Sequence, residues 1–310
     1  PAGVVSQTLR DLGYDFTYGI CDAPSSLLHA FAKLNHVSQD EVTGDCYGLN
    51  HLSFFSNVKL KGQDIMPRLL EDDEVYQKTD MRFFEKDLAK HLGCILNEYL
   101  YYFYYREMAL ENILKAGITR GEVIRDVNRG MTEELSHMDI EHDFDNCLRV
   151  FEKWYGMREN AYMANETGIK TGKPPFSFDI YEKDSGGYAG VALKYMYSEL
   201  SGQESEMILC VPNQGAIPGL RDTDVVEITC TIRDGKYIPH KIDEPGELQM
   251  ELIRRVKSYE RYASQALRTN SRSKAVDCLM LHPLVNSYSL AQKLVSQYIE
   301  SNKNYTEEWT

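Results

Sequence analysis

A thiol and a carboxylate stand side by side at Cys21 and Asp22, within the stretch Gly19–Pro24. Thiolates bind transition metals and act as nucleophiles, and carboxylates donate or accept protons, so this pair is suited to metal or acid–base chemistry. The residues alone leave a plainer interpretation open. A single cysteine is often a small buried apolar residue, and an aspartate close before a proline is common in turns.

The segments on either side would place this pair in a turn. Residues 15–20 are rich in aromatic and β-branched side chains, which predicts a short strand, and Pro24 predicts its end. Residues 25–34 then repeat apolar side chains at helical spacing, with Ser25 or Ser26 as a candidate N-cap. We therefore expect a connection between a strand and a helix, from which both side chains can reach one cavity.

Histidines stand at two further places where the pattern predicts regular structure. His51 lies in a strand-like stretch over residues 45–58, so we expect it within a strand or at its end. Residues 132–167 predict a charged helix that carries His137 and His142. Histidines five residues apart point about 140° apart on a helix, unlike the pair in HExxH, so we expect a solvated face there.

An aromatic run from Tyr99 to Tyr105 lies in residues 83–114, which have helical periodicity with a break near Gly93. The run is too aromatic to be only a solvated face. Two interpretations stay open. Either the tyrosines belong to a core helix and hydrogen-bond at its margins, or one or two of them line a cavity.

The second half of the chain combines helices with antiparallel strands. Residues 170–178, with Pro174 and Pro175, are the best candidate for a mobile loop, and the polar tail over 301–310 is expected to fray. The other predicted elements are helices over 119–128 and 189–200, strands over 207–211 and 225–232 with a hairpin turn at Asp234-Gly235, and helices from 246 onward with breaks near Asn270 and at His282-Pro283.

Composition limits the class of protein. With 310 residues and 43% hydrophobic content, the chain can bury one large core or two modest ones. A net charge of −13 opposes general binding to nucleic acid or to anionic membranes. Seven scattered cysteines without CxxC spacing fit reduced thiols. No apolar run is long enough to span a bilayer, so we expect a cytoplasmic protein.

Four stretches, in their order and spacing, resemble the family 4 glycosidases, an NAD- and metal-dependent group with a fold akin to lactate and malate dehydrogenases. They are Cys21-Asp22-Ala23-Pro24, residues 48–51, residues 99–102, and residues 211–217 followed by 224–227. The resemblance implies an α+β fold with an antiparallel sheet and many helices. It covers all of 1–310 as one substrate- and metal-binding domain, in which residues 1–14 resemble the tail of an absent N-terminal Rossmann domain.

The resemblance implies roles for three residues at the metal. Cys21 and His51 look like the two protein ligands of a divalent ion, usually manganese, a donor set that suits a first-row metal with open positions. Asp22 would be the general acid that protonates the leaving glycosidic oxygen. The sequence Cys-Asp-x-Pro resembles the branch that acts on 6-phospho-α-glucosides, whereas Cys-Asn-x-Pro is typical of the β-linked branch.

Four more residues receive roles from the resemblance. Tyr99 would be the base that removes the C2 proton, with Tyr102 as the second candidate. Asn50 would hold a sugar hydroxyl. Arg120 would contact the substrate or its phosphate, for which a guanidinium is well suited, although a surface arginine on a helix is an equally open interpretation.

The function implied is hydrolysis of 6-phospho-α-glucosides such as maltose 6-phosphate, by NAD-dependent oxidation, elimination, addition and reduction with a divalent metal. One alternative is a 6-phospho-β-glucosidase or another glycosidase of the same family. An alternative of another class is a non-catalytic fragment that acts as an assembly or sugar-binding module. We expect the fragment alone to be inactive and the full-length protein to be a homo-oligomer, with a phosphorylated disaccharide as substrate and no nucleic acid or membrane as partner.

Overall fold

The computed structural model describes residues 2–169, 175–178 and 187–310. Most of the loop expected over 170–178 therefore lies outside the described residues. Two compact units make up the chain. Pro1–Phe103 and Ser185–Thr310 form the first, and Tyr104–Asp184 form the second.

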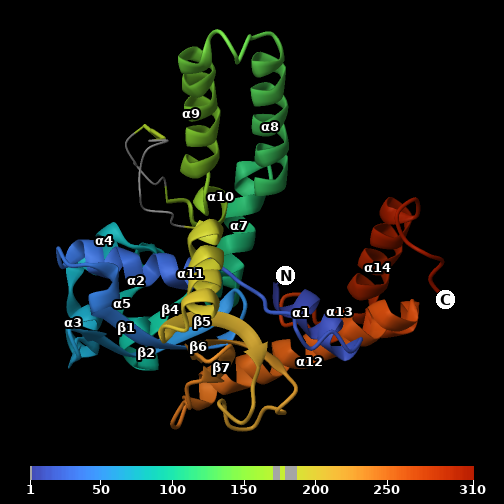
Figure 1. Ribbon diagram of the computed structural model, residues 1–310. Helices are drawn as coiled ribbons and strands as arrows, with labels where there is room; N and C mark the ends of the chain where they lie inside the picture. Colours follow the sequence, from blue (N-terminus) through green and yellow to red (C-terminus); the bar gives the residue numbers. More distant parts are fainter. Residues whose placement is uncertain (1, 170–174, 179–186) are drawn as a thin grey trace. The chain divides into compact units, whose positions relative to one another are not determined.

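The first unit is built on one antiparallel sheet (Figure 1). Its strands follow the order β3-β2-β1-β6-β5, while β4 pairs with β2 and β7 pairs with β6. The expected α+β class with an antiparallel sheet is confirmed. The strands are β1 (Val42–Leu49), β2 (Leu52–Leu60), β3 (Gln63–Asp64), β4 (Ile95–Leu96), β5 (Ser205–Pro212), β6 (Val225–Arg233) and β7 (Lys236–Pro239).

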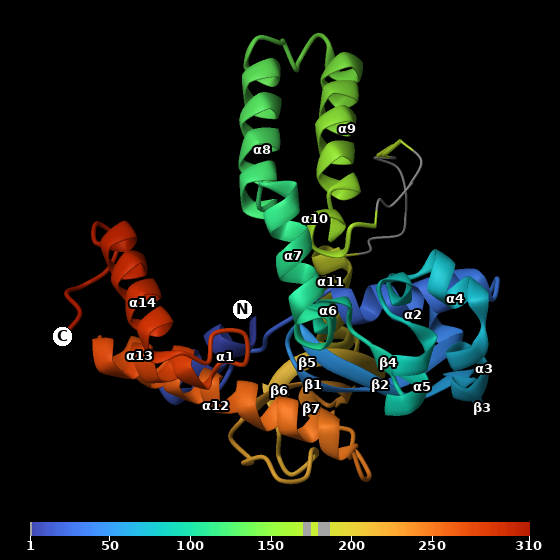
Figure 2. The ribbon, with the colours of Figure 1, turned by 180° about the vertical axis from the view of Figure 1, so that it is seen from behind.

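Helices cover the sheet, and the central strands are buried on both faces. The first six residues of β6 are all buried, as expected for a strand packed on both sides. In Figures 1 and 2, α12 runs beneath the strands and α11 stands on the other side. The helices of this unit are α1 (Ala2–Asp11), α2 (Ala23–Leu34), α3 (Met66–Glu71), α4 (Asp73–Lys78), α5 (Lys86–Leu92), α6 (Tyr101–Tyr104), α11 (Gly187–Ser201), α12 (Glu247–Thr269), α13 (Arg272–Leu281) and α14 (Tyr288–Asn302).

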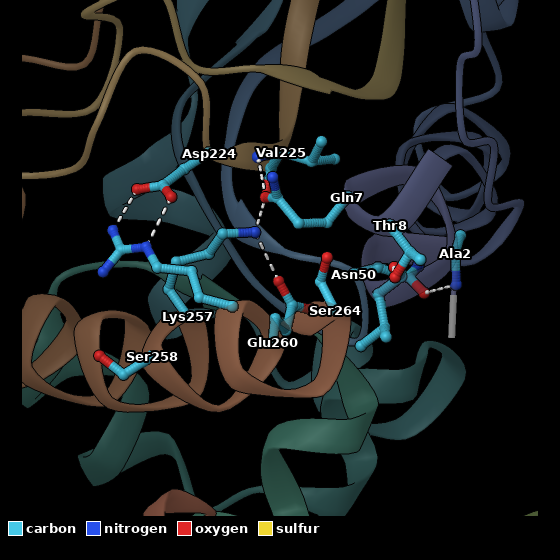
Figure 3. A network of polar contacts seen from close by, with 12 residues as sticks. Ala2, Gln7, Thr8, Asn50, Asp224, Val225, Lys257, Ser258, Glu260 and Ser264 are labelled. Atoms are coloured by element: carbon cyan, nitrogen blue, oxygen red, sulfur yellow. Dashed lines mark hydrogen bonds and ion pairs between the residues drawn. The ribbon is translucent and has the colours of Figure 1, made fainter. Parts of the chain in front are cut away.

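Buried polar groups tie α1 and α12 to the start of β6 (Figure 3). Lys257 on α12 is fully buried, and its Nζ donates to the carbonyl of Val225 and to Oε2 of Glu260, each at 2.7 Å. The backbone N–H of Val225 donates in turn to Oε1 of Gln7 on α1 at 2.8 Å. A buried charge is tolerated only when it is paired and hydrogen-bonded, so these contacts fix both helices against the sheet.

The second unit contains α7 (Arg106–Ala116), α8 (Arg120–Ser136), α9 (Phe144–Asn160) and α10 (Ala164–Thr167). A capping box at Thr119 and Glu122 starts α8, and α8 packs beside α9 as an antiparallel hairpin (Figure 2). The single helix predicted over 132–167 is wrong, because the chain turns between the two helices. His137 and His142 lie at this turn and are exposed, so the expected solvated position is confirmed.

Three predictions about elements near the candidate residues are wrong. Residues 15–20 form no strand and contribute only one bridge, from Gly19 to Cys210. The helix after it begins at Ala23 with Asp22 as its N-cap, not with Ser25 or Ser26. The helix predicted over 83–114 is broken into α5, β4, the 3-10 turn Glu98–Leu100, α6 and α7.

The carboxyl-terminal helices form a small core of their own. Val276, Ala291 and Val295 are buried together where α13 packs on α14. The fraying expected over residues 301–310 does not reach the last residue. The backbone N–H of Thr310 donates to the carbonyl of Asn270 at 2.9 Å, and the carbonyl of Thr310 accepts from the N–H of Arg272 at 2.7 Å. No helix in the part of the chain that the structure describes is long and apolar enough to cross a bilayer.

Candidate active site around Cys21 and His51

Cys21 and Asp22 lie where the chain leaves the edge of the sheet and enters α2. Gly19 and Cys210 exchange two backbone hydrogen bonds of 3.0 and 2.8 Å, which fix this segment beside β5. Cys21 is buried, with 4% of its surface exposed. Asp22 is partly exposed, and its carboxylate makes no capping hydrogen bond to α2, so this side chain is available for other contacts.

His51 and Asn50 form the two-residue turn between β1 and β2, where Leu49 pairs with Leu52. His51 is therefore between two strands, not within one or at its end. The turn depends on Gly48, which has a φ of 137° and whose missing Cβ would lie 2.3 Å from the carbonyl oxygen of Leu52. His51 itself has a φ of 65°, an uncommon conformation for a residue with a side chain.

Asn50 connects this turn to Cys21 and to the sheet. Its Nδ2 donates to Oε1 of Glu227 on β6 at 3.0 Å, and its Oδ1 accepts from the backbone N–H of Ala2 at 3.1 Å. The thiol of Cys21 lies within hydrogen-bonding reach of the same amide side chain. The structure thus brings Cys21 close to the residue that directly precedes His51.

Tyr99 packs on the imidazole of His51. The two ring centroids are 4.1 Å apart and the planes are inclined by 19°. The 3-10 turn that carries Tyr99 is capped by Asn97, whose side chain accepts from the backbone N–H of Tyr99 at 3.0 Å. Tyr102 follows on α6 and is partly buried. Tyr99, the first candidate base, thus contacts His51.

Burial sets the charge of both candidate ligands. It lowers the pKa of His51 to about 4, so the imidazole is neutral and has a free lone pair at neutral pH. Burial and the nearby Glu227 raise the pKa of the Cys21 thiol to about 11, so a bound cation would have to displace its proton. A thiolate and a neutral imidazole fit a first-row divalent ion.

No group of three or more His, Cys, Asp or Glu side chains that could hold a metal occurs among residues 2–169, 175–178 and 187–310. A catalytic metal keeps positions open for substrate and water. Two protein ligands are consistent with such an open site.

Two residues near the site were not given roles by the sequence. Glu227 is 1% exposed on β6, and Tyr188 in the first turn of α11 has its hydroxyl within hydrogen-bonding reach of Cys21. Burial, together with Cys21 and Asp22, raises the pKa of Tyr188 to about 12. Glu227 did carry a signal, since a lone carboxylate in an apolar strand requires a specific partner.

Arg120 belongs to the second unit, where it is the first residue of α8. It is partly buried, and its place at the start of a helix leaves the interpretation as a surface arginine on a helix open. Its guanidinium carbon lies 4.9 Å from the ring centroid of Tyr162. Its Nη1 is buried and has no hydrogen-bond partner among the described residues, which fits a group that binds an anion from outside.

Known proteins resemble this chain along almost its whole length. It is 25% identical over 308 residues to the 6-phospho-beta-glucosidase BglT of Thermotoga maritima, with 98% of this chain and 65% of that protein covered. It is 26% identical over 323 residues to the maltose-6'-phosphate glucosidase MalH of Clostridium acetobutylicum, with 98% of this chain and 66% of that protein covered. The chain therefore spans about two thirds of the length of these relatives.

Solved structures share the fold. The Thermotoga maritima 6-phospho-beta glucosidase, solved with NAD and glucose-6-phosphate, aligns with a TM-score of 0.70 at 22% identity, over 99% of this chain and 66% of that one. A 6-phospho-alpha-glucosidase from gut microorganisms, also in complex with NAD and glucose-6-phosphate, aligns with a TM-score of 0.69 at 22% identity, over 100% of this chain and 65% of that one.

The model of one protein family matches residues 46–285, which include the His51 turn, the tyrosine run and all of β5 and β6. That model describes the family 4 glycosyl hydrolase C-terminal domain. The sheet, the turn at Asn50 and His51, and the match over most of the sequence agree, and the chain belongs to family 4 of the glycosyl hydrolases.

Proposed function

We propose that this chain is the substrate- and metal-binding part of a 6-phospho-α-glucosidase that uses NAD and a divalent metal, such as manganese. The observation that carries the proposal is the convergence on one turn of residues from three distant segments. Cys21 lies beside Asn50, and Tyr99 stacks on His51. Relatives with NAD, Mn2+ and glucose-6-phosphate in their solved structures support the cofactor and substrate class.

Each residue of the site has a part in the proposed reaction. The cofactor would supply a hydride acceptor and the metal a Lewis acid. Cys21 and His51 would hold the ion, which would thereby orient the sugar. Tyr99, packed against His51, accepts a proton from the sugar ring, and the partly exposed carboxyl of Asp22 protonates the leaving oxygen.

Two further residues would bind the substrate. Arg120, with its unpartnered buried Nη1, would contact the sugar phosphate. Asn50 would approach a sugar hydroxyl, although its amide already bonds to Glu227 and to the backbone of Ala2. We propose that the full-length protein works in the cytoplasm as a homo-oligomer.

The choice of the α anomer rests on Asp22. The relative at 25% identity is a 6-phospho-beta-glucosidase, and the relative at 26% identity is a maltose-6'-phosphate glucosidase. Overall similarity therefore does not select one anomer. The natural full-length protein, with NAD and Mn2+, should hydrolyse a nitrophenyl 6-phospho-α-glucoside. Turnover of the β-linked isomer alone would contradict the proposal and assign the protein to the other branch.

A second candidate function follows from the coverage of 65% of the relatives' length. A part of that size could bind sugar phosphate and metal without catalysing the reaction. We expect the 310-residue chain to bind Mn2+ and glucose 6-phosphate but little NAD in calorimetric titrations, and to be inactive alone. Loss of hydrolysis in the full-length protein as well would favour the binding module.

A further inference from the structure

Glu227 is a buried carboxylate that forms no ion pair with the residues that the structure describes. Glu227 is 1% exposed and lies on β6, at the centre of the sheet. It is paired with Gly48 of β1, next to the turn. Its Oε2 has no hydrogen-bond partner among the described residues. The buried ammonium of Lys257 bonds to Glu260 and to the carbonyl of Val225.

The other oxygen of Glu227 holds the turn. Oε1 accepts from Asn50 Nδ2 at 3.0 Å and from the thiol of Cys210 at 3.8 Å. Asn50 Oδ1 accepts from Ala2 N–H at 3.1 Å. The side chain of Asn50 is therefore clamped from two directions, by β6 and by the first residue of α1, as its contact with Ala2 in Figure 3 illustrates.

This clamp acts on a strained backbone. His51 has a φ of 65° although it is not glycine, and such a conformation persists only when surrounding contacts fix it. Of the two residues in the turn, His51 is stacked on Tyr99 and Asn50 is bound to Glu227. The direction of the imidazole thus depends on both contacts.

We propose that Glu227 is a positioning residue that, through its hydrogen bond to Asn50, fixes the Asn50–His51 turn and so aims the imidazole of His51 toward the ion held with Cys21. The inference deepens the proposed function and rests on the metal site assigned there. Glu227 is too deeply buried to touch the substrate itself. Outer contacts of this kind typically change metal affinity by about 10- to 100-fold when they are removed.

Thr229 is the matched control, because its contacts serve only to hold the strands together. It lies two residues further along β6 and is equally buried. Its hydroxyl donates to the carbonyl of Gly44 at 2.8 Å and accepts from the N–H of Cys46 at 2.9 Å. Thr229 thus joins the same two strands as Glu227 without contacting the turn.

The first experiment needs no metal. In the 310-residue chain with labelled histidines, the ring signals of His51, assigned with His51→Asn, should carry the shift that stacking on Tyr99 produces. Glu227→Leu should lose this shift, whereas Glu227→Gln, which keeps an acceptor for Asn50, and Thr229→Val should retain it. Unchanged His51 signals in a folded Glu227→Leu would overturn the inference.

The second experiment measures Mn2+ binding from the paramagnetic resonance signal of the free ion. Glu227→Leu should weaken binding by about 10- to 100-fold, and Thr229→Val and Glu227→Gln should keep the affinity of the unchanged chain. Equal losses in Glu227→Leu and Thr229→Val would assign Glu227 to general stability and overturn the inference.

Two outcomes need separate treatment. If Glu227→Leu does not fold, Asn50→Ala cuts the same hydrogen bond from the turn, and the same loss of ring shift is expected; a retained shift would overturn the inference. If the unchanged chain binds no Mn2+, the metal site of the proposed function fails, whereas the His51 ring shift still decides whether Glu227 positions the turn.

Discussion

Cys21 and Asp22 are neighbours in the sequence but occupy different environments. Cys21 is buried within hydrogen-bonding reach of Asn50 and Tyr188, whereas Asp22 is partly exposed at the start of α2. A metal ligand needs surroundings that hold it in place, and a general acid needs access to the substrate and to protons. The two environments match the two proposed roles.

Asp22→Asn tests the general-acid role. Removing a positioned acid should lower kcat by about 10²- to 10⁴-fold on a 6-phospho-α-glucoside with a poor leaving group. The loss should be much smaller with a nitrophenyl leaving group, which departs without protonation, and Mn2+ affinity should stay unchanged. Steady-state kinetics of the full-length protein on both substrates is the measurement, and equal losses on the two would contradict the role.

The sequence does not contain the contacts that join the candidate residues. The roles of Cys21, Asp22, His51 and Tyr99 come from the resemblance to the family 4 glycosidases and stay proposals. Glu227 was not assigned a role, because its contact with Asn50 joins residues 177 positions apart, and such a pairing follows from strand order. The order β1-β6-β5 is set by the packing of the whole sheet.

At the scale of elements, the β1–β2 hairpin carries the largest local constraint. Gly48→Ala should destabilise the protein by about 2 kcal/mol or more, because the added Cβ would lie 2.3 Å from the carbonyl oxygen of Leu52 at a φ of 137°. Denaturant unfolding measures the change. Gly121→Ala, in the open first turn of α8, is the control and should be neutral or stabilising by up to about 1 kcal/mol.

The contact between His240, which follows β7, and Asp45 on β1 should make stability depend on pH. Hydrogen bonding to Asp45, 3.3 Å away, raises the pKa of His240. Although burial opposes it, the same contact lowers the pKa of Asp45. A histidine whose pKa is raised on folding contributes stability that is fully present below its unfolded pKa, about 6.5, and lost as the pH rises through the folded value.

His240→Gln should therefore lower the thermal midpoint more at pH 5.5 than at pH 8.5. Thr231→Val is the control, because it removes the hydroxyl that lies 3.0 Å from Nε2 of His240 without removing a group that titrates in this range. Its effect should be the same at both pH values. An effect of His240→Gln that does not vary with pH would exclude an ionic contact with Asp45.

The elements that the sequence predicted well are those with a clear period. The helices α11 and α12 and the strands β5 and β6 lie where apolar spacing placed them. The strand expected over 15–20 failed because aromatic content alone did not supply a pairing partner. The long helix over 83–114 failed because β4 pairs with β2 in its middle, which is a tertiary contact that local periodicity does not contain.

At the scale of the whole molecule, the candidate site around Cys21, His51 and Tyr99 belongs to the first of two compact units. Arg120 belongs to the second unit. The first unit is continuous in space but not in sequence, since the second is inserted between Phe103 and Ser185. The single domain expected over 1–310 is thus a sheet-based body interrupted by a helical insertion.

The central claim is that Cys21 and His51 hold one divalent cation in this chain. It is tested most directly by Mn2+ titration of the 310-residue chain, followed through the paramagnetic resonance of the free ion. Cys147, on α9 of the second unit, is as buried as Cys21 at 4% exposure and supplies the matched control. We predict one Mn2+ site that is lost in Cys21→Ser and in His51→Asn and retained in Cys147→Ser. Mn2+ binding that survives both Cys21→Ser and His51→Asn would contradict the account.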